Sequence, residues 1–504
     1  MLSLTAAALL CGALAGCRGH GKPVELRVGF GSGITTIDPH AERTFASFEQ
    51  LGNVYEPLTQ LDQDLRVRPA LALSWTNPDL LTWVFRLRAG VLFHDGSPFT
   101  ADDVVASYQR LLANQDLKMR SYLAGVTEVS AGADGSVVVK TGWPNAQLLS
   151  GLSFVPIVKR GATRDGLTTS PNGTGAWRIV AWEPPSRLVL ERNERYWGPR
   201  PAAGRIVADL GLAEPAAVAG VKSGLYEALR YATPDAENAA KADARYRVVR
   251  QPNLYLRHLG YDMARDRTPF VPGIPNPFRR PEVREAVQLA LDLPRMAAAV
   301  DPQAVPAEQL VPRAVFGYRP GIGLPVRDLP RARQLMKEAG LAGGFDVSLH
   351  RSGFATAARV VKEQLAEIGI RVTIVEMQSA DFFVAVGRGE LSFWIVSNGC
   401  PSGDATEALW SSFHAPDPAR GAGVDNHAGY RNPELDAKVD EAIRLFEPRL
   451  RLPVLQQALS VVLADRVWIP LYYSNDVFIV KRSIGYTPRE DGMLRYADLM
   501  TSPR

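Results

Sequence analysis

Cysteine is scarce in this chain, which has only three cysteines among its 504 residues. Cys11 and Cys17 lie in a short apolar segment at the amino terminus, and Cys400 is the only one in the remainder. A single cysteine cannot form an intramolecular disulfide, and it cannot supply the several thiolates of a cysteine-based zinc site. The sequence therefore predicts a fold that is stabilised by its hydrophobic cores, with no cofactor and no metal.

Motifs of catalysis are missing as well. The chain contains no Gly-x-Ser-x-Gly elbow, no His-Glu-x-x-His and no Gly-x-x-x-x-Gly-Lys-Ser/Thr. Its seven histidines are scattered, and His414 and His427, the closest pair in the second half, bracket a loop rather than share a helix face. A hydrolase or transferase requires a positioned nucleophile, a metal or a cofactor cradle. The sequence therefore favours a binding protein over an enzyme, with a hydrolase as the weaker alternative.

Charge and hydropathy exclude two further classes of protein. The chain has 57 basic and 53 acidic residues, so nothing in its charge calls for a nucleic-acid partner. Beyond residue 17, no apolar run approaches the roughly 20 residues of a membrane-spanning helix. The length is sufficient for two or three domains with sizeable cores.

The amino terminus is an uncharged apolar run that is too short to cross a bilayer comfortably. It ends in Leu-Ala-Gly-Cys at residues 14–17, which resembles a bacterial lipobox. This resemblance implies that residues 1–16 are a lipoprotein signal peptide and that Cys17 is lipidated after cleavage. The mature protein would then be held at a membrane through its lipid anchor.

The most informative stretch is residues 85–104, FRLRAGVLFHDGSPFTADDV. Alternating apolar residues before Ala89 predict a half-buried strand, and Thr100 with Asp103 has the spacing of a capping box at a helix start. Between them, His94 and Asp95 occupy a turn. We interpret these two side chains as turn residues rather than as an acid/base pair.

Residues 328–395 alternate between helical and strand patterns. Strands are predicted at 345–349, 370–374 and 391–395, separated by helices, and this βαβ order predicts a parallel sheet with right-handed crossovers. Ligands of such sheets lie beyond the carboxyl ends of the strands, so the loops after Leu349 and Ile395 are candidates for a binding site. Further helices are predicted to begin at Asn432 and Pro453.

The stretch at 85–104 resembles, almost residue for residue, the signature of the family 5 extracytoplasmic solute-binding proteins of ABC importers, which include oligopeptide-, dipeptide- and nickel-binding proteins. Shorter matches occur at residues 53–58 (NVYEPL), 171–177 (PNGTGAW), 190–198 (LERNERYWG) and 488–492 (PREDG). The resemblance covers most of the chain. For the glycine turn at 171–177, a structural role is favoured over ligand contact.

The resemblance implies an α/β fold of the two-lobed periplasmic-binding-protein type (type II), with an inserted extra subdomain and hinge-linked lobes around a ligand cleft. Lobe 1 would comprise residues 17–48, 170–261 and 474–504, the inserted subdomain residues 49–169, and lobe 2 residues 262–473. The expected protein is a monomer, periplasmic or on the cell surface. It would capture a solute by closure and deliver it to an ABC permease driven by separate ATPase subunits.

The resemblance also suggests ligand-binding residues. Peptide-binding relatives hold the ligand's amino group with an aspartate after a Trp-x-x pattern, and the gapless match here runs from Trp394 to Ser397 and Asn398, with Asp404 as the nearest replacement acid. Arg351 matches the position that holds a ligand carboxylate in dipeptide-binding relatives. Short peptides are the expected solute, with a nickel chelate, a sugar or an opine as alternatives. Ser32, in the glycine turn after the first strand, completes the candidate set.

Overall fold

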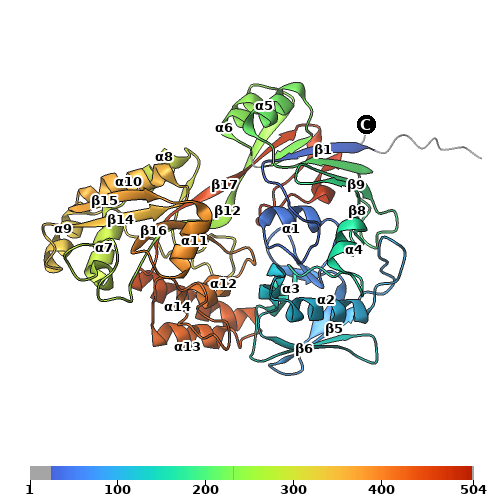
Figure 1. The fold of residues 1–504 in the computed structure, drawn as a ribbon, viewed down its shortest axis with the longest axis horizontal. Coiled ribbons are helices and arrows are strands. Elements are labelled where there is room, and N and C mark those ends of the chain that lie inside the picture. The colour runs from blue at the N-terminus through green and yellow to red at the C-terminus, as the bar shows by residue number, and fades with distance from the viewer. Residues whose placement is uncertain (1–23, 231, 502–504) are drawn as a thin grey trace, which may run out of the picture.

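The computed structural model describes residues 24–230 and 232–501 and shows a mixed α/β protein with two lobes (Figure 1). The predicted signal peptide and Cys17 lie outside the described residues. One eleven-stranded sheet runs through both lobes, with β13 (Val305–Pro306) paired to β17 at its side. The other strands follow the order β15 (Ile370–Glu376), β14 (Phe345–Arg351), β16 (Phe393–Gly399), β12 (Tyr246–Tyr261), β17 (Ile469–Lys481), β11 (Ala228–Arg230), β1 (Glu25–Phe30), β10 (Arg205–Asp209), β9 (Arg187–Arg192) and β8 (Trp177–Glu183).

The sheet of lobe 1 is centred on β1. This strand pairs in parallel with β10 on one side and β11 on the other, while β9 and β8 extend the sheet antiparallel. Leu26, Val28 and Phe30 alternate along β1 and are buried in the lobe's core, as their spacing requires.

A four-stranded antiparallel sheet forms most of the inserted subdomain. Its order is β4 (Ala72–Thr76), β5 (Thr82–Leu87), β7 (Val137–Thr141) and β6 (Val126–Ala131). Helix α2 (Ala101–Ala113) packs against it and begins with the predicted capping box of Thr100 and Asp103. Trp83 and Phe85 are buried, which confirms the predicted half-buried strand.

Three of the motifs that carry the family resemblance meet at one buried carboxylate. Glu56 accepts hydrogen bonds from Thr174 Oγ1 at 2.8 Å, Tyr196 Oη at 2.9 Å and Trp197 Nε1 at 2.9 Å. Burial raises the pKa of Glu56 in spite of these three donors. The motifs at 53–58, 171–177 and 190–198 thus join the inserted subdomain to lobe 1.

His94 has a similar structural role. Its Nδ1 accepts from the Gly173 amide at 3.2 Å, and its Nε2 lies 3.0 Å from the Gly175 carbonyl. The ring therefore contacts the backbone of the glycine turn at 171–177 at two points. A Cβ on Gly173 would lie 2.0 Å from the Val54 carbonyl oxygen, which explains the glycine there. Burial lowers the pKa of His94 to about 4, so the ring is neutral near pH 7. The interpretation of His94 and Asp95 as turn residues is confirmed.

Lobe 2 contains the predicted parallel sheet. Strand β14 pairs in parallel with β15 and β16, and helices α7 (Pro281–Ala290), α9 (Leu329–Glu338) and α10 (Ala355–Ala366) contribute to the same core. Below this sheet in Figure 1 lie α13 (Pro433–Ala442) and α14 (Pro448–Asp465). The prediction of a helix start at Pro453 is wrong, because Pro453 lies inside α14. One lost amide near the start is tolerated, since Leu455, Leu459 and Val462 bury the helix against the core.

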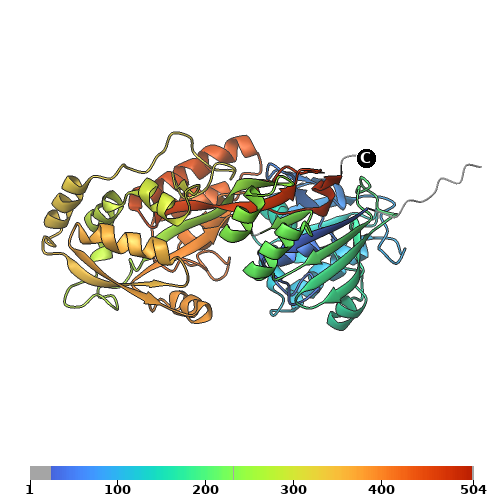
Figure 2. The ribbon, with the colours of Figure 1, turned by 90° about the horizontal axis from the view of Figure 1, so that it is seen from above.

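Two long strands, β12 and β17, connect the lobes. They pair with each other along most of their length, and Figure 2 shows β17, in red, running from one lobe into the other. The pairing is interrupted between Pro252 and Leu256, where the register shifts. Strand β12 then pairs with β16 of lobe 2, while β17 pairs with β11 of lobe 1. We place the hinge at this interruption; the division of the chain at 261–262 and 473–474 remains a proposal.

The Glu56 contacts generate the first testable prediction. Glu56→Ala leaves three buried or half-buried donors without their acceptor, and we expect it to lower the free energy of unfolding by at least about 1.5–3 kcal/mol in urea titrations. Glu183→Ala removes an exposed carboxylate on β8 and should change it by less than about 0.5 kcal/mol. Equal effects of the two substitutions would contradict the structural role of Glu56.

Candidate functional site

A cavity of about 410 Å³ lies between the two lobes, next to the hinge strand β12. This volume is within the range of about 300–1,000 Å³ that is typical of pockets for small-molecule ligands. The wall on the side of lobe 1 is formed by Arg43, Phe45, Phe48, Ser121, Tyr122, Ala124, Asn145, Gln147, Leu148, Ser150 and Gly151. The opposite wall is formed by Tyr255, Ser397, Asn398, Gly399, Pro401, Ser402, Glu407, Ala408, Trp410, Ser411, Ser412, Gly421, Val424 and Asp425.

Aromatic packing positions the wall on the side of lobe 1. Helix α1 (Phe45–Leu51) begins at Thr44, whose side chain accepts from the Ser47 amide, and it brings Phe48 to the cavity. The Tyr122 ring stacks on Phe154 at 5.0 Å between centroids and meets Phe48 edge-on at 6.0 Å. This wall is therefore fixed by the core of lobe 1 and its inserted subdomain.

The opposite wall is formed by the chain that follows β16. Ser397 and Asn398 line the cavity, so the structure brings these two predicted residues to it. Ser402 and Glu407 follow, the latter on the single helical turn α12 (Thr406–Ala408). A loop at the carboxyl end of a strand in an open α/β sheet is the expected position for a ligand. The other predicted loop, after β14, does not reach the cavity.

The other predicted site residues lie elsewhere. Asp404 is buried, and Arg451 Nη1 and Nη2 each lie 2.7 Å from one of its carboxylate oxygens. Arg351 pairs with Glu376 at 2.9 Å, and its Nη1 donates to the Gly353 carbonyl. Trp394 is 3% exposed and packs in a cluster with Phe382, and Ser32 is exposed after β1. None of these four lines the cavity.

Glu407 is one of the cavity residues that the sequence did not indicate. Its Oε2 accepts from the Ser402 amide at 3.1 Å and from Ser402 Oγ at 2.6 Å. Burial raises the pKa of the Glu407 carboxyl, and the Ser402 hydrogen bonds oppose this shift. Burial, assisted by the charge of Glu407, also raises the pKa of Tyr255 to about 12. In the sequence, Glu407 could be recognised only as an acid in the loop after the predicted strand at 391–395. Asp404 lies in the same loop, so the sequence did not distinguish the two acids.

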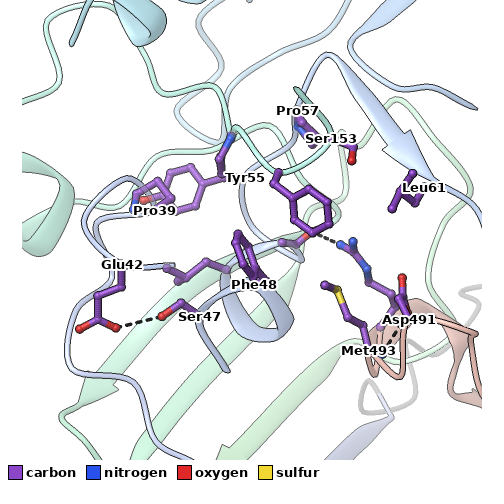
Figure 3. Close-up of a pocket in the computed structure, with 15 residues that line it drawn as sticks. Pro39, Glu42, Ser47, Phe48, Tyr55, Pro57, Leu61, Ser153, Asp491 and Met493 are labelled. Carbon is purple, nitrogen blue, oxygen red and sulfur yellow. Dashed lines mark hydrogen bonds between the residues drawn. The ribbon is translucent and has the colours of Figure 1, made fainter. Parts of the chain in front are cut away.

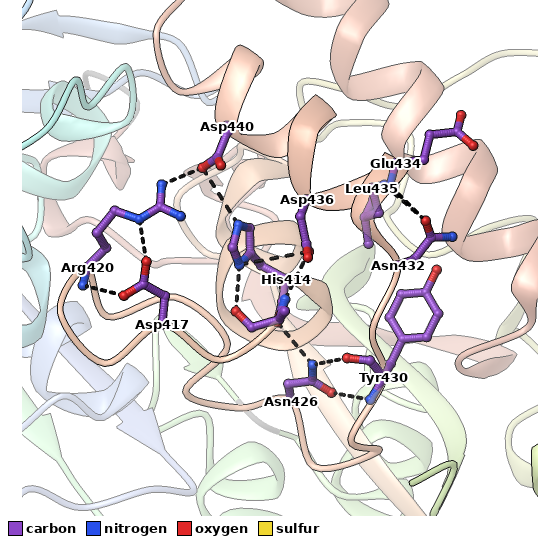
Figure 4. A network of polar contacts seen from close by, with 11 residues as sticks. His414, Asp417, Arg420, Asn426, Tyr430, Asn432, Glu434, Leu435, Asp436 and Asp440 are labelled. Carbon is purple, nitrogen blue, oxygen red and sulfur yellow. Dashed lines mark hydrogen bonds and ion pairs between the residues drawn. The ribbon is translucent and has the colours of Figure 1, made fainter.

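The loop between His414 and Tyr430 supplies Gly421, Val424 and Asp425 to the cavity lining. Figure 4 shows the polar contacts that hold this loop. Asn426 closes the loop, because its Nδ2 donates to the carbonyls of both His414 (3.0 Å) and Tyr430 (2.8 Å). Arg420 of the same loop forms ion pairs with Asp417 in the loop and with Asp440 on α13. These contacts hold the loop against α13.

The hinge contains a buried cluster of charges. Arg230 Nε lies 3.4 Å from Glu49 on α1, and Arg230 Nη2 lies 3.1 Å from Asp476 on β17. Burial raises the pKa of Glu49 to about 7 although Arg230 opposes the shift. The cluster connects a hinge strand directly to the helix that carries one wall of the cavity.

A second, smaller pocket of about 40 Å³ lies within lobe 1, between α1 and the chain near Asp491 (Figure 3). This volume has room for a few water molecules at most, since one water needs about 10–15 Å³ of such space. Its wall is braced by Arg495 Nη1, which donates to the Gly52 carbonyl at 2.8 Å. It is too small for a solute.

Two kinds of feature are absent from the described residues. Residues 24–230 and 232–501 contain no group of three or more His, Cys, Asp or Glu side chains arranged to hold a metal ion. Over the same ranges, no helix has both the length and the apolar character needed to span a membrane.

Comparison with known proteins gives consistent matches. The family model "Bacterial extracellular solute-binding proteins, family 5 Middle" matches residues 66–419. The glutathione-binding protein GsiB of Shigella dysenteriae is 25% identical, and the match covers 93% of this chain and 92% of that protein. Heme-binding protein A of Haemophilus influenzae is also 25% identical, over 84% of this chain and 80% of its own length.

Solved structures show the same fold. The periplasmic binding protein DppA of Helicobacter pylori, in complex with the peptide STSA, superposes with a TM-score of 0.78 at 22% identity, over 95% of this chain and 98% of its own. HbpA2 of Haemophilus parasuis superposes with a TM-score of 0.82 at 20% identity, over 95% of this chain and all of its own. The predicted two-lobed, type II periplasmic-binding-protein fold is confirmed.

The Glu49 cluster predicts a pH dependence of stability. The native pKa of Glu49 lies above its ordinary value of 4.5, so the native state holds this proton more tightly than the unfolded chain does. The resulting stabilisation is complete below pH 4.5 and is lost as the pH rises through about 7. In urea titrations at about pH 5 and about pH 8, Glu49→Gln should therefore gain stability relative to the unsubstituted protein at the higher pH. Glu183→Gln, at an exposed site, should leave the difference between the two pH values unchanged.

The Asp404–Arg451 pair predicts a loss of stability. Arg451→Met leaves the buried Asp404 carboxylate without its counter-charge, and we expect a decrease of about 3–5 kcal/mol in the free energy of unfolding. The matched control is Arg449→Met, which alters an exposed arginine of the same helix and should cost less than about 0.5 kcal/mol. A small effect of Arg451→Met in the same urea titrations would show that Asp404 does not depend on this partner.

Proposed function

Because the chain belongs to the family 5 bacterial extracellular solute-binding proteins, the solute-binding components of ABC importers, we propose that it captures short peptides between its lobes. Members of this family bind solutes and are not enzymes. The proposed protein is a monomer that delivers its ligand unchanged to a membrane permease, whose ATPase subunits are separate chains.

The observation that carries this proposal is the composition of the cavity walls. One wall comes from lobe 1 and its inserted subdomain, and the other from the hinge strand and lobe 2. A solute in this cavity contacts both walls only when the lobes are closed. Its binding energy therefore favours the closed form over the open one, which is the requirement for ligand-driven closure.

The chemistry of the walls supports a peptide as the ligand. Hydroxyl and amide side chains, which suit the alternating donors and acceptors of a peptide backbone, come from both walls. Aromatic rings in both walls supply apolar contacts for side chains. The polar residues are Ser121, Asn145, Gln147, Ser150, Ser397, Asn398, Ser402, Ser411 and Ser412, and the aromatic residues are Phe45, Phe48, Tyr122, Tyr255 and Trp410.

The proposal includes attachment to a membrane. Lipidation at Cys17, after removal of residues 1–16, would keep the binding protein in the periplasm or at the cell surface, close to its permease. This part of the proposal rests on the Leu-Ala-Gly-Cys motif at residues 14–17.

Closure on a ligand is directly measurable. With fluorophores on cysteines introduced at Asp116 in the inserted subdomain and Lys337 on α9, both exposed, energy transfer should rise when a peptide binds. Mass spectrometry should recover the peptide unchanged. A fluorophore pair at Asp116 and Asp165, both in the inserted subdomain, should show no change. Chemical conversion of the peptide would contradict a binding role, and a constant signal from the first pair with every solute would contradict closure.

A further inference from the structure

The two lobes also touch each other outside the cavity. Trp83, on β5 of the inserted subdomain, meets Phe446, which follows α13 of lobe 2, edge-on with 5.1 Å between the ring centroids. Close by in sequence to Phe446, the Ile443 carbonyl accepts a hydrogen bond from the Ala146 amide of the inserted subdomain at 2.9 Å. We call these four residues the latch. None of them lines the cavity.

The latch and the hinge lie on opposite sides of the cavity. In Figure 1, β5 and α13 are at the bottom of the molecule, the strands β12 and β17 cross between the lobes near the top, and the cavity-lining helices α1 and α12 lie between these two levels. A rotation about the hinge displaces the most distant points furthest. Opening the lobes would therefore separate the two halves of the latch.

Local structure explains why the latch residues are available for this contact. Ile443 is the C-cap of α13, where helix carbonyls lack partners within the helix. Ala146 lies between Asn145 and Gln147, which both line the cavity, so its hydrogen bond ties one cavity wall to lobe 2. Phe446 is half-buried and packs against the same hydrophobic core as Trp83. The contact thus stabilises the closed arrangement without touching a solute.

A further pocket, of about 220 Å³, lies behind the hinge. Leu254 lines this rear pocket, whereas the next residue, Tyr255, lines the inter-lobe cavity, because consecutive side chains of a strand point to opposite faces. Gln251 and Glu490 of lobe 1 form one side of the rear pocket, and Val305 of lobe 2 lies on the other. Since β12 separates the two spaces, a rotation that widens the cavity narrows the rear pocket.

Resting on the proposed function, we propose that the latch and the rear pocket set the free energy of lobe closure, independently of the solute. The apparent affinity of a binding protein is reduced by the fraction of molecules that are not in the binding-competent form. A change in the latch should therefore alter the affinity for every solute by one common factor. Cavity residues would determine which solute binds, and Phe446 would determine how tightly all of them bind.

The first test is isothermal titration calorimetry of Phe446→Ala with tri-alanine and glutathione. We expect both peptides to bind about three- to tenfold more weakly, and by the same factor, because an aromatic pair is lost from the closed form only. The matched control is Phe383→Ala on α11 (Ser379–Gly387), which removes a 57% exposed ring of lobe 2 and should leave both affinities unchanged.

The second test changes the rear pocket in the opposite direction. Val305→Trp places a large ring at this exposed position, where it hinders the narrowing that accompanies opening. We expect it to strengthen binding of both peptides and to raise energy transfer between fluorophores at residues 116 and 337 before any solute is added. Phe446→Ala should lower that solute-free signal. Val326→Trp, at an 86% exposed position of lobe 2, is the control and should change neither quantity.

The outcomes distinguish this inference from the proposed function. If the unsubstituted protein bound and closed on a peptide while Phe446→Ala kept its affinity, or weakened the two peptides by different factors, the latch would be refuted and the proposed function would stand. Val305→Trp behaving like Val326→Trp would refute the role of the rear pocket. If neither peptide bound, the proposed function would fail, and an unchanged solute-free signal in both variants would refute the latch as well. The melting temperature of each variant shows whether it is folded.

Discussion

The backbone pairing of β12 with β17 is the constraint on which the rest of the molecule depends. Both strands belong to a sheet that continues through two lobes, so their hydrogen bonds fix how the lobes face each other. The pairing shifts register twice, once between Pro252, which has no amide to donate, and Leu256, and again between Arg257 and His258. We place the hinge at the first of these shifts, where Tyr255 is part of the cavity wall. A ligand that contacts Tyr255 acts directly at the place where the lobes move.

Local patterns in the sequence were sufficient to predict much of the fold. The strand with Trp83 and Phe85, the capping box of Thr100 and Asp103, and the parallel strands of lobe 2 all follow from spacing alone, and the structure confirms them. Pro453 was misjudged because a helix packed along one face can lose an amide near its start.

The residues of the candidate binding site were harder to predict from local sequence patterns. Asp404 and Glu407 are equivalent as acids in one loop, and the difference between them is Arg451, which is 47 residues away from Asp404 in sequence. Arg351 is likewise opposite Glu376 only because β14 and β15 pair in one particular register. Ser397 and Asn398, which were indicated by the family resemblance, do line the cavity. Long-range contacts therefore decide which polar side chains the fold neutralises and which remain open to a ligand.

The residues that identify the family and those that line the cavity are largely different. The motifs with Glu56, Thr174, Tyr196 and Trp197 join the inserted subdomain to lobe 1, and none of these four lines the cavity. A substitution in the cavity can therefore change the solute without loosening this junction. Family membership consequently constrains the architecture much more tightly than it constrains the cargo.

The Arg230 cluster has a consequence for the order in which the chain acquires its structure. Glu49 meets Arg230 and also accepts from the amide of Leu494, while Tyr496 donates its amide to Asn53, so the first and last parts of the sequence share one buried centre. Lobe 1 thus remains incomplete until the final segment has been synthesised, whereas the parallel sheet of lobe 2 uses a continuous stretch of chain. Contacts between such distant segments form slowly. The amino-terminal lobe therefore reaches its native packing only after the carboxyl-terminal segment has joined it.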